Sequence, residues 1–250
     1  MKIFITGISS GIGRSLCKEL IYLGHTVWGI ARKENLLKEL KENLNSNKFF
    51  YNVCNTADEI EVKKVAEEMR KVNFLPDVVV LNAAVEKKDF SEDYQNKITR
   101  EVFDVNFFGA LIWVEMFIKK FIERGYGQFI AISSIFAKRP DIDSVSYCAS
   151  KSALSMAFRS LNLHYIKRNI IFKNIYFGPV DTDISSSYRS SSTKKSFFVI
   201  SPETAAKCII KAMKGEKLSH YFPFLVALPV RLTSFLSDLI FFKITRFFRR

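Results

Sequence analysis

The sequence is poor in the residues that build metal centres and disulfide frameworks. It has four cysteines, Cys17, Cys54, Cys148 and Cys208, and no two of them are close in the chain. Its three histidines are scattered. Because no pair of these residues has zinc-type spacing, we expect free thiols in a reducing compartment and no metal site.

Acidic residues are fewer than basic ones, and the N-terminal apolar run is short. The run after Met1 and Lys2 is too short for a signal peptide, which predicts a cytoplasmic protein. Asp and Glu number 25 against 38 Lys and Arg, giving a formal net charge of +13. This charge favours an anionic partner: a phosphorylated cofactor or substrate, acidic lipid, or nucleic acid. Since the sequence has no recognition motif for nucleic acid, we expect none as a partner.

Strand-like and helix-like patterns alternate along the 250 residues. The predicted strands are Lys2–Thr6, Thr26–Ala31, Lys48–Val53, Asp77–Asn82, Gln128–Ser133, Ile171–Phe177 and a weak one near Tyr221–Phe224. The predicted helices are Gly13–Leu23, Lys33–Asn43, Thr56–Val72, Asn96–Arg124, Ser146–Arg168 and Pro202–Lys214. Several strands are apolar on both faces, as a sheet covered by helices on each side requires. The order predicts an α/β protein with one Rossmann-like, doubly wound parallel sheet.

A glycine-rich turn follows the first predicted strand. It reads Thr6-Gly7-Ile8-Ser9-Ser10-Gly11-Ile12-Gly13, and a helix begins at once. Glycines let the backbone approach a pyrophosphate closely, and the helix N-terminus supplies free N–H groups and a positive dipole. The turn therefore predicts a dinucleotide site, although a tight strand–helix connection without ligand gives the same pattern.

The end of the second strand favours NADP(H) over NAD(H). NAD-binding folds place an acidic residue there for the ribose 2′-hydroxyl, whereas an arginine suits a 2′-phosphate. Here the strand runs into Arg32 and Lys33, with no acidic residue before Glu34. The guanidinium can form a forked hydrogen bond to phosphate, and the lysine adds a point charge. A solvated helix start is the alternative.

The glycine turn and five further blocks, in order, resemble the short-chain dehydrogenase/reductase family. The glycine turn has the form TGxxxGxG, and Asn82-Ala83-Ala84 resembles the NAG stretch. Tyr147 and Lys151 match YxxxK, with Ser134 13 residues and Asn106 41 residues before the tyrosine. Phe177-Gly178-Pro179-Val180-Asp181-Thr182 resembles the PG…T block. The resemblance covers residues 1–215, which we predict to be the NADP-binding and catalytic domain, with 216–250 as a C-terminal extension.

The resemblance implies an oxidoreductase that transfers a hydride between nicotinamide and a carbonyl or secondary alcohol. It implies four catalytic residues: Asn106, Ser134, Tyr147 and Lys151. Tyr147 would be the acid or base, its pKa lowered by the nearby cation of Lys151. Ser134 would hydrogen-bond the substrate oxygen, and Asn106 would hold a water linking Lys151 to solvent. The expected cofactor-binding residues are Thr6, Gly7, Ser9, Ser10, Gly11, Ile12, Gly13, Arg32, Lys33, Asn52, Val53, Asn82, Ala83, Ala84, Tyr147, Lys151, Gly178, Val180 and Thr182.

Three positions depart from the family pattern. Ala84 replaces the glycine of NAG, and Phe177 replaces a proline. Asn52 stands where many relatives carry an aspartate near the adenine, and an amide can still hydrogen-bond an adenine edge. None of these changes removes a catalytic group. The loop Asp183–Ser201, with Arg189, Lys194 and Lys195, is predicted to lie over the substrate site.

The tail Tyr221–Arg250 combines seven phenylalanines and five basic residues with one acid. It is too interrupted to span a bilayer. From Val230 to Arg250 apolar residues recur at helical spacing, which predicts an imperfectly amphipathic C-terminal helix. Such a helix suits an anionic membrane surface on the cytosolic side, and equally its own fold or a second subunit.

Two functional classes therefore stand. The first is an NADP(H)-dependent enzyme acting on a small-molecule or lipid-linked carbonyl or alcohol, which the resemblance implies is a homodimer or homotetramer. The second is a catalytically silent scaffold or redox sensor that binds the cofactor without turnover. Loss of the tyrosine or lysine usually marks the second class, and both Tyr147 and Lys151 are present.

Overall fold

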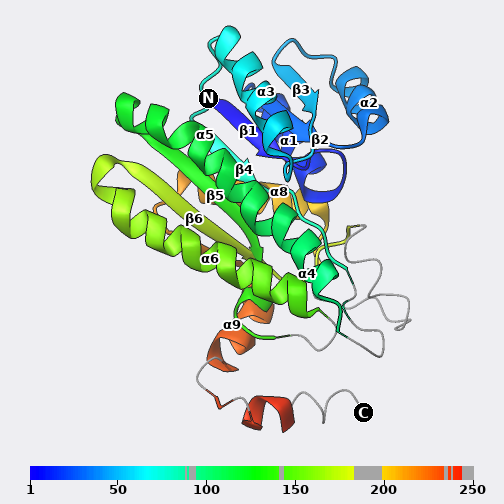
Figure 1. Cartoon of the computed structure of the whole chain (residues 1–250), viewed down its shortest axis with the longest axis vertical. Helices are drawn as coiled ribbons and strands as arrows, with labels where there is room; N and C mark the ends of the chain where they lie inside the picture. Colours follow the sequence, from blue (N-terminus) through cyan, green and yellow to red (C-terminus); the bar gives the residue numbers. More distant parts are fainter. Residues whose placement is uncertain are drawn as a thin grey trace.

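The computed structural model describes residues 1–87, 89, 94–140, 144–182, 199–233, 236–237 and 239–243. Parallel strands form one seven-stranded sheet in the order β3-β2-β1-β4-β5-β6-β7 (Figure 1). They are β1 (Lys2–Thr6), β2 (Thr26–Ala31), β3 (Phe49–Val53), β4 (Val78–Leu81), β5 (Gly127–Ser134), β6 (Ile170–Phe177) and β7 (Ser219–Phe222). The predicted Rossmann-like α/β fold in a single domain is confirmed.

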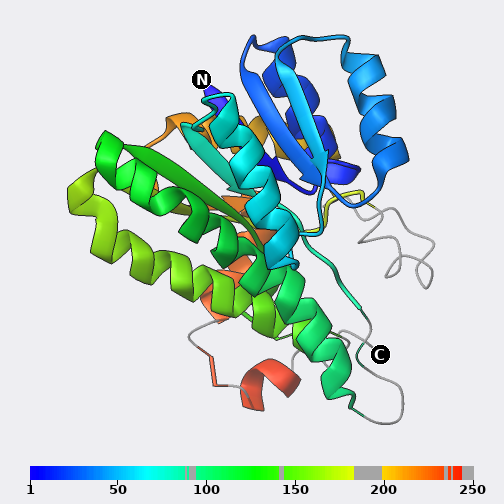
Figure 2. The same ribbon diagram turned by 45° about the horizontal axis from the view of Figure 1, so that its top comes forward.

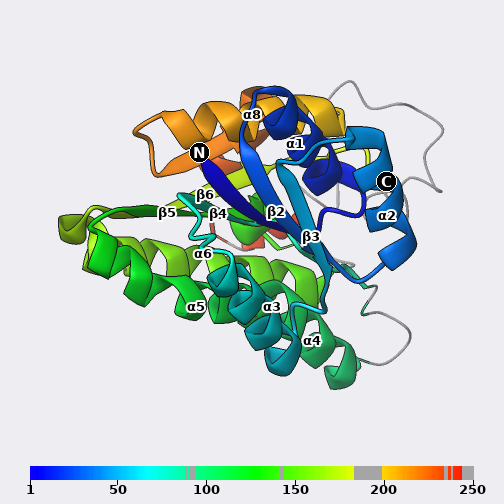
Figure 3. The same ribbon diagram turned by 90° about the horizontal axis from the view of Figure 1, so that it is seen from above.

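Helices cover both faces of this sheet. They are α1 (Gly11–Tyr22), α2 (Glu34–Leu44), α3 (Glu59–Lys71), α4 (Asn96–Phe103), α5 (Gly109–Arg124), α6 (Val145–Tyr165), α8 (Pro202–Lys214) and α9 (Phe224–Thr233). Helices α1, α2 and α8 pack on one face, and α3, α5 and α6 pack on the other (Figure 3). The fold thus has the three layers that a doubly wound sheet requires.

Alternation along β1 divides the core in two. Ile3 and Ile5 face the α1 and α8 layer, while Phe4 faces the opposite layer. The second half is rich in aromatic rings, and the Phe4 and Trp113 ring centroids lie 4.3 Å apart. Because β1 is buried on both faces, its position at the centre of the sheet is fixed by packing from both sides.

One predicted helix is interrupted. Periodicity predicts a continuous helix over Asn96–Arg124, but the structure divides it into α4, the short π-helix η1 (Asp104–Phe108) and α5. A π-turn inserts one extra residue per turn without changing which residues are apolar, so periodicity cannot reveal it. The insertion turns Asn106, which is fully buried, toward the loop after β4.

The tail differs from its prediction. The helix α9 begins at Phe224, six residues before the predicted start, and Leu236 and Ser237 are not helical before a short helical stretch at 239–243. A continuous helix over Val230–Arg250 is therefore wrong, and residues 244–250 lie outside the described residues. Among the described helices, none is long and apolar enough to cross a membrane. Strand β7 lies within the predicted extension and completes the sheet beside β6.

The strand order reverses direction between β1 and β4. Strands β2 and β3 extend to one side of β1, and β4, β5 and β6 extend to the other (Figure 2). The loops that leave the carboxyl ends of β1 and β4 therefore diverge, and ligands of doubly wound sheets bind at such a crevice. The residues predicted as functional lie mainly on these loops and on α6.

Candidate active site

The glycine turn after β1 has the backbone that a phosphate cradle needs. Gly7 and Gly11 have φ of 76° and 52°, in the region that favours glycine. A Cβ on Gly7 would lie 2.8 Å from Ala83 Cα, and one on Gly13 would lie 2.2 Å from the carbonyl oxygen of Gly7. The turn is thus closed behind by its own backbone and by the loop after β4, which leave no room for a side chain at Gly7 or Gly13.

Thr6 and Asn82 join this turn to the end of β4. The Thr6 hydroxyl accepts hydrogen bonds from the backbone N–H groups of Asn82 (3.0 Å) and Ala83 (2.9 Å). The Asn82 side-chain amide donates to the carbonyl oxygens of Thr6 (3.1 Å) and Gly7 (3.0 Å). These four hydrogen bonds hold the cradle in one conformation, which is the role the structure gives both residues.

The start of α1 points into the crevice. Ser10 is the N-cap residue, and its side chain caps none of the N–H groups in the first turn of this described helix. Those N–H groups and the helix dipole are therefore available to an anion. Ser9, Gly11 and Ile12 line the same part of the cavity.

Arg32 and Lys33 follow β2 and line the cavity at the same end. Both side chains are exposed, and within the described part of the chain neither forms an ion pair. Asn52, expected near the adenine, lies elsewhere. Its side chain accepts a hydrogen bond from Trp28 Nε1 (2.8 Å) on β2 and donates to Glu68 (2.6 Å) on α3, so it links these two elements.

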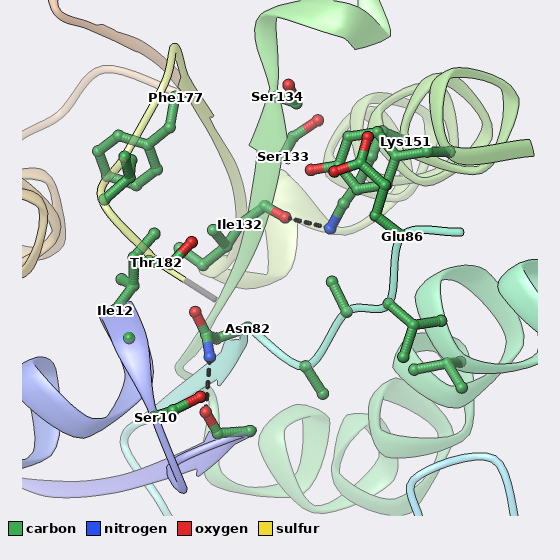
Figure 4. A pocket seen from close by; sticks show the side chains of 18 of the residues that line it. Ser10, Ile12, Asn82, Glu86, Ile132, Ser133, Ser134, Lys151, Phe177 and Thr182 are labelled. Carbon is green, nitrogen blue, oxygen red and sulfur yellow. Dashed lines mark hydrogen bonds between the residues drawn. The ribbon is translucent and has the colours of Figure 1, made fainter. Parts of the chain in front are cut away.

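The other end of the cavity carries Ser134, Tyr147 and Lys151. Figure 4 labels Ser134 and Lys151 there. Ser134 ends β5, and the other two lie one turn apart on α6, so their side chains share a helix face. Lys151 Nζ donates to the carbonyl oxygen of Ile132 (2.8 Å) and lies 5.7 Å from the centroid of the Tyr147 ring. The Ser134 hydroxyl also accepts from the Phe136 N–H (3.2 Å), so it caps a short turn as well as facing the cavity.

The pKa values of Tyr147 and Lys151 are shifted mainly by burial. Burial raises the pKa of Tyr147, the carboxylate of Glu86 adds to the increase, and a hydrogen bond with Ser134 lowers it in part. Burial lowers the pKa of Lys151 to about 8, against a smaller opposing effect of Glu86. The expected net lowering of the Tyr147 pKa is therefore wrong for this structure, because loss of solvent around the phenol dominates. Tyr147 is a protonated phenol at neutral pH.

Asn106 does not line the cavity. Its side-chain amide donates to Val85 O (2.9 Å) and Ser150 Oγ (3.0 Å), and its oxygen accepts from the Val85 N–H (2.8 Å). Ser150 in turn donates to Tyr147 O (2.9 Å). Asn106 thus ties the loop after β4 to the helix that carries Tyr147. Its predicted role in holding a water stays a prediction.

Most predicted site residues meet at one cavity of about 690 Å³. Those lining it are Gly7, Ser9, Ser10, Gly11, Ile12, Arg32, Lys33, Asn82, Ala83, Ala84, Ser134, Tyr147, Lys151, Gly178, Val180 and Thr182. Those outside the lining are Thr6, Gly13, Asn52, Val53 and Asn106. Of these five, Thr6, Gly13 and Asn106 shape the walls from behind, whereas the Asn52 side chain is engaged elsewhere and Val53 is exposed.

Further residues line the cavity beyond the predicted set, and two groups of them bear on its chemistry. The first comprises Cys54, Asn55 and Thr56 after β3, where the family pattern directed attention to Asn52 and Val53 instead. The second is Glu86, which accepts a hydrogen bond from the Ser144 hydroxyl (3.0 Å). No motif marks Glu86. Its place four residues after Asn82, at the carboxyl end of β4, is the signal that could have found it.

The segment after β6 closes the cavity on the remaining side. Gly178, Val180 and Thr182 line it, and the Thr182 methyl lies 2.9 Å from the position that a Cβ on Gly11 would take. Val180 pairs with Ile200 as an isolated bridge, and the Asp181 N–H donates to the Ile200 carbonyl (2.9 Å). Arg189, Lys194 and Lys195 of the predicted substrate loop lie outside the described residues.

Comparisons with known proteins agree with this geometry. A sequence model of the family described as short chain dehydrogenase matches residues 1–193. The chain is 29% identical to an uncharacterized oxidoreductase of Staphylococcus haemolyticus over 209 residues, covering 84% of this chain and 89% of that protein. It is 30% identical to the 3-oxoacyl-[acyl-carrier-protein] reductase of Rickettsia prowazekii over 181 residues, covering 72% and 73%. A serine dehydrogenase solved with NADP+ superposes with a TM-score of 0.82 at 18% identity, covering 89% and 94%, a likeness of fold.

Proposed function

Because this chain belongs to the short-chain dehydrogenase family, whose members bind a nicotinamide cofactor and catalyse hydride transfer, we propose that it is an NADPH-dependent carbonyl reductase or alcohol dehydrogenase. One observation carries the proposal. Ser134, Tyr147 and Lys151 converge at one end of a cavity whose other end is a glycine turn at a helix N-terminus. The cavity volume of about 690 Å³ lies in the range of ligand pockets.

The site residues fit the cofactor. The cradle has close backbone approaches that a Cβ would fill, and its helix N–H groups suit a pyrophosphate. In this proposal Ser9, Ser10, Gly11 and Ile12 hold the phosphates, and Lys151 holds the ribose next to the nicotinamide. The bound nicotinamide supplies or accepts the hydride, and the protein supplies orientation and proton transfer.

Tyr147 is the proposed proton donor in reduction. Its phenol is protonated at neutral pH because burial raises its pKa. Ser134 donates a hydrogen bond to the same substrate oxygen and stabilises the charge that develops there. Lys151, cationic below about pH 8, lowers the cost of forming a phenolate when Tyr147 gives up its proton.

The preference for NADPH over NADH rests on Arg32 and Lys33. Both follow β2 and line the cavity. A 2′-phosphate placed there gains charge-assisted hydrogen bonds from the guanidinium. NADH would present a 2′-hydroxyl here instead. The end of β2 offers no carboxylate to accept a hydrogen bond from it, because the strand ends in Ala31 and Arg32 and Lys33 follow.

The test is an assay of NADPH oxidation, followed at 340 nm, with aldehydes, ketones and a 3-oxoacyl thioester. We expect turnover of at least one class and a lower KM for NADPH than for NADH. Tight NADPH binding, measured by calorimetry, without turnover of any compound would favour the silent scaffold instead.

An apolar stripe on α9 supports a second proposal, that the tail binds an anionic membrane surface. Phe224, Leu228 and Leu232 are 59%, 37% and 58% exposed and recur every four residues, so they lie along one helix side. Leu239, Ile240 and Phe242 are also exposed in the next helical stretch. The five basic residues of the tail add electrostatic attraction to acidic lipid. A homodimer or homotetramer that covers this stripe is the competing assembly.

Co-sedimentation with phosphatidylglycerol vesicles separates the two. We expect binding at low salt, weaker binding at high salt, and loss of binding in the triple variant Phe224→Ser, Leu228→Ser, Leu232→Ser. The control is Leu163→Ser, at an apolar side chain of α6 that is 81% exposed. Unchanged binding by the triple variant would contradict the proposal, and a change from dimer to monomer without vesicle binding would assign the stripe to a second subunit.

A further inference from the structure

Glu86 gives the catalytic end of the cavity a negative charge. Of the described residues that line the cavity, four are charged: Arg32, Lys33, Lys151 and Glu86. The first two lie at the nucleotide end, and Glu86 is the acidic one. A protein with a net charge of +13 thus presents a carboxylate where its substrate must bind.

The carboxylate is held in place from two sides. The preceding residue, Val85, has both its N–H and its carbonyl hydrogen-bonded by the buried side chain of Asn106. The Ser144 hydroxyl donates to Glu86 Oε1 at 3.0 Å, and Ser144 is itself fully buried at the N-terminus of α6. These hydrogen bonds fix Glu86 in the wall of the cavity, where it is only partly exposed.

Glu86 is close enough to the reacting groups for both to respond to its charge. It raises the pKa of Tyr147, and it raises that of Lys151 against the larger effect of burial. Figure 4 shows Glu86 beside Lys151, on the side of the cavity across from Phe177 and Thr182. Glu86 and Tyr147 line the same cavity, so a substrate whose oxygen meets the Tyr147 hydroxyl would bring the atoms bonded to its reacting carbon toward Glu86.

We propose that Glu86 is a specificity-determining residue that selects carbonyl substrates with a hydrogen-bond donor, a hydroxyl or an ammonium group, on the carbon next to the reacting one. The inference rests on the proposed function and names its substrate class. The carboxylate accepts a hydrogen bond from either donor, and a charged donor gains most. A carboxylate on the substrate at this place is repelled, because it brings two like charges together.

The experiment compares four small carbonyl compounds that differ in the group beside the carbonyl: aminoacetone, hydroxyacetone, butanone and pyruvate. In the wild-type protein, with NADPH, we expect kcat/KM to fall in that order. In Glu86→Gln the advantage of aminoacetone over butanone should shrink by about tenfold, the worth of one charge-assisted hydrogen bond. The change should lie mainly in KM, because the proton donor Tyr147 is intact.

Two further variants separate charge from structure. Glu86→Asp keeps the charge and should keep the order of substrates. Glu123→Gln removes an exposed carboxylate paired with Lys120 and should leave all four values unchanged. Thermal unfolding of each variant checks that the fold is retained.

The outcomes distinguish this inference from the proposed function. Equal use of aminoacetone, hydroxyacetone and butanone by the wild-type protein, unchanged in Glu86→Gln, would overturn the inference and leave the reductase assignment intact. Failure of the wild-type protein to reduce any of the four, or any compound of the wider assay, would contradict the proposed function and the inference with it.

Discussion

The two ends of the cavity use different kinds of chemical group. We call the end at the glycine turn the nucleotide end, and the end at Ser134, Tyr147 and Lys151 the catalytic end. The nucleotide end uses mainly backbone, with a turn that has no room for a Cβ at Gly7 or Gly13 and the N–H groups of α1. Two exposed cations after β2 complete it. The catalytic end uses side chains, with Lys151 buried and Tyr147 shifted in pKa by its burial. We therefore expect substitutions at the first end to change affinity, and substitutions at the second to change turnover and its dependence on pH.

The largest effect is expected at Tyr147. Tyr147→Phe removes the proton donor and keeps the ring, so turnover should fall by roughly 10²–10⁴-fold, the usual contribution of a positioned acid. The dissociation constant of NADPH should change little. Tyr165→Phe, on the same helix and outside the cavity lining, is the control. Near-normal turnover in a folded Tyr147→Phe variant would contradict the assignment of Tyr147 as proton donor, and with it the expectation that this end of the cavity determines turnover.

Arg32→Asp tests the opposite end. Replacing the guanidinium by a carboxylate should weaken NADPH binding by roughly ten- to a hundredfold, the worth of charged hydrogen bonds to one phosphate. NADH binding should weaken far less, and kcat at saturating cofactor should be nearly unchanged. Arg168→Asp makes the same charge change in the short turn that precedes the amino end of β6, outside the cavity lining. If the wild-type protein binds NADH with the same affinity as NADPH, our interpretation of Arg32 is wrong.

The pH dependence gives the smallest effect and sharpens the comparison most. Because burial lowers the pKa of Lys151 to about 8, its ammonium is present below that pH and lost above it. The kcat/KM of reduction should therefore be level below about pH 8 and fall above it, since this ratio reports ionisations of the free enzyme. In Lys151→Arg the fall near pH 8 should vanish, because the guanidinium stays charged. A wild-type profile that is flat from pH 7 to 9.5 would contradict this role.

The sheet was the most predictable part of the fold. Runs such as Val78-Val79-Val80-Leu81 are apolar on both faces, so their burial identifies β4 without ambiguity. Helix starts were less predictable. The helix predicted from Thr56 begins at Glu59, because the Asp58 carboxylate accepts hydrogen bonds from the N–H groups of Ile60 and Glu61. The helix start in the tail was also predicted wrongly. Helix α9 starts at Phe224 and continues through Pro229.

The site divides in the same way. Glycine spacing and the YxxxK pair point to one cavity because backbone space and helix periodicity are written directly in the sequence. The positions of the Asn52 and Glu86 side chains could not be predicted in this way, because their hydrogen-bond partners come from segments far away in the chain. Trp28 draws the Asn52 amide into the sheet, whereas Ser144 holds Glu86 at the cavity wall.

The hydrogen bonds between Thr6 and the loop after β4 have a consequence for the folding of the chain. They join residues 76 and 77 positions apart, on two strands that are adjacent in the sheet but separated in sequence by β2 and β3. Contacts of such long range form late, because the intervening chain must first be ordered. A polypeptide still emerging from the ribosome therefore has no dinucleotide cradle until β4 has been made and has joined β1. Cofactor binds the finished sheet and not the unfolded chain, so it stabilises the native state by an amount that grows with the logarithm of its concentration once this exceeds the dissociation constant.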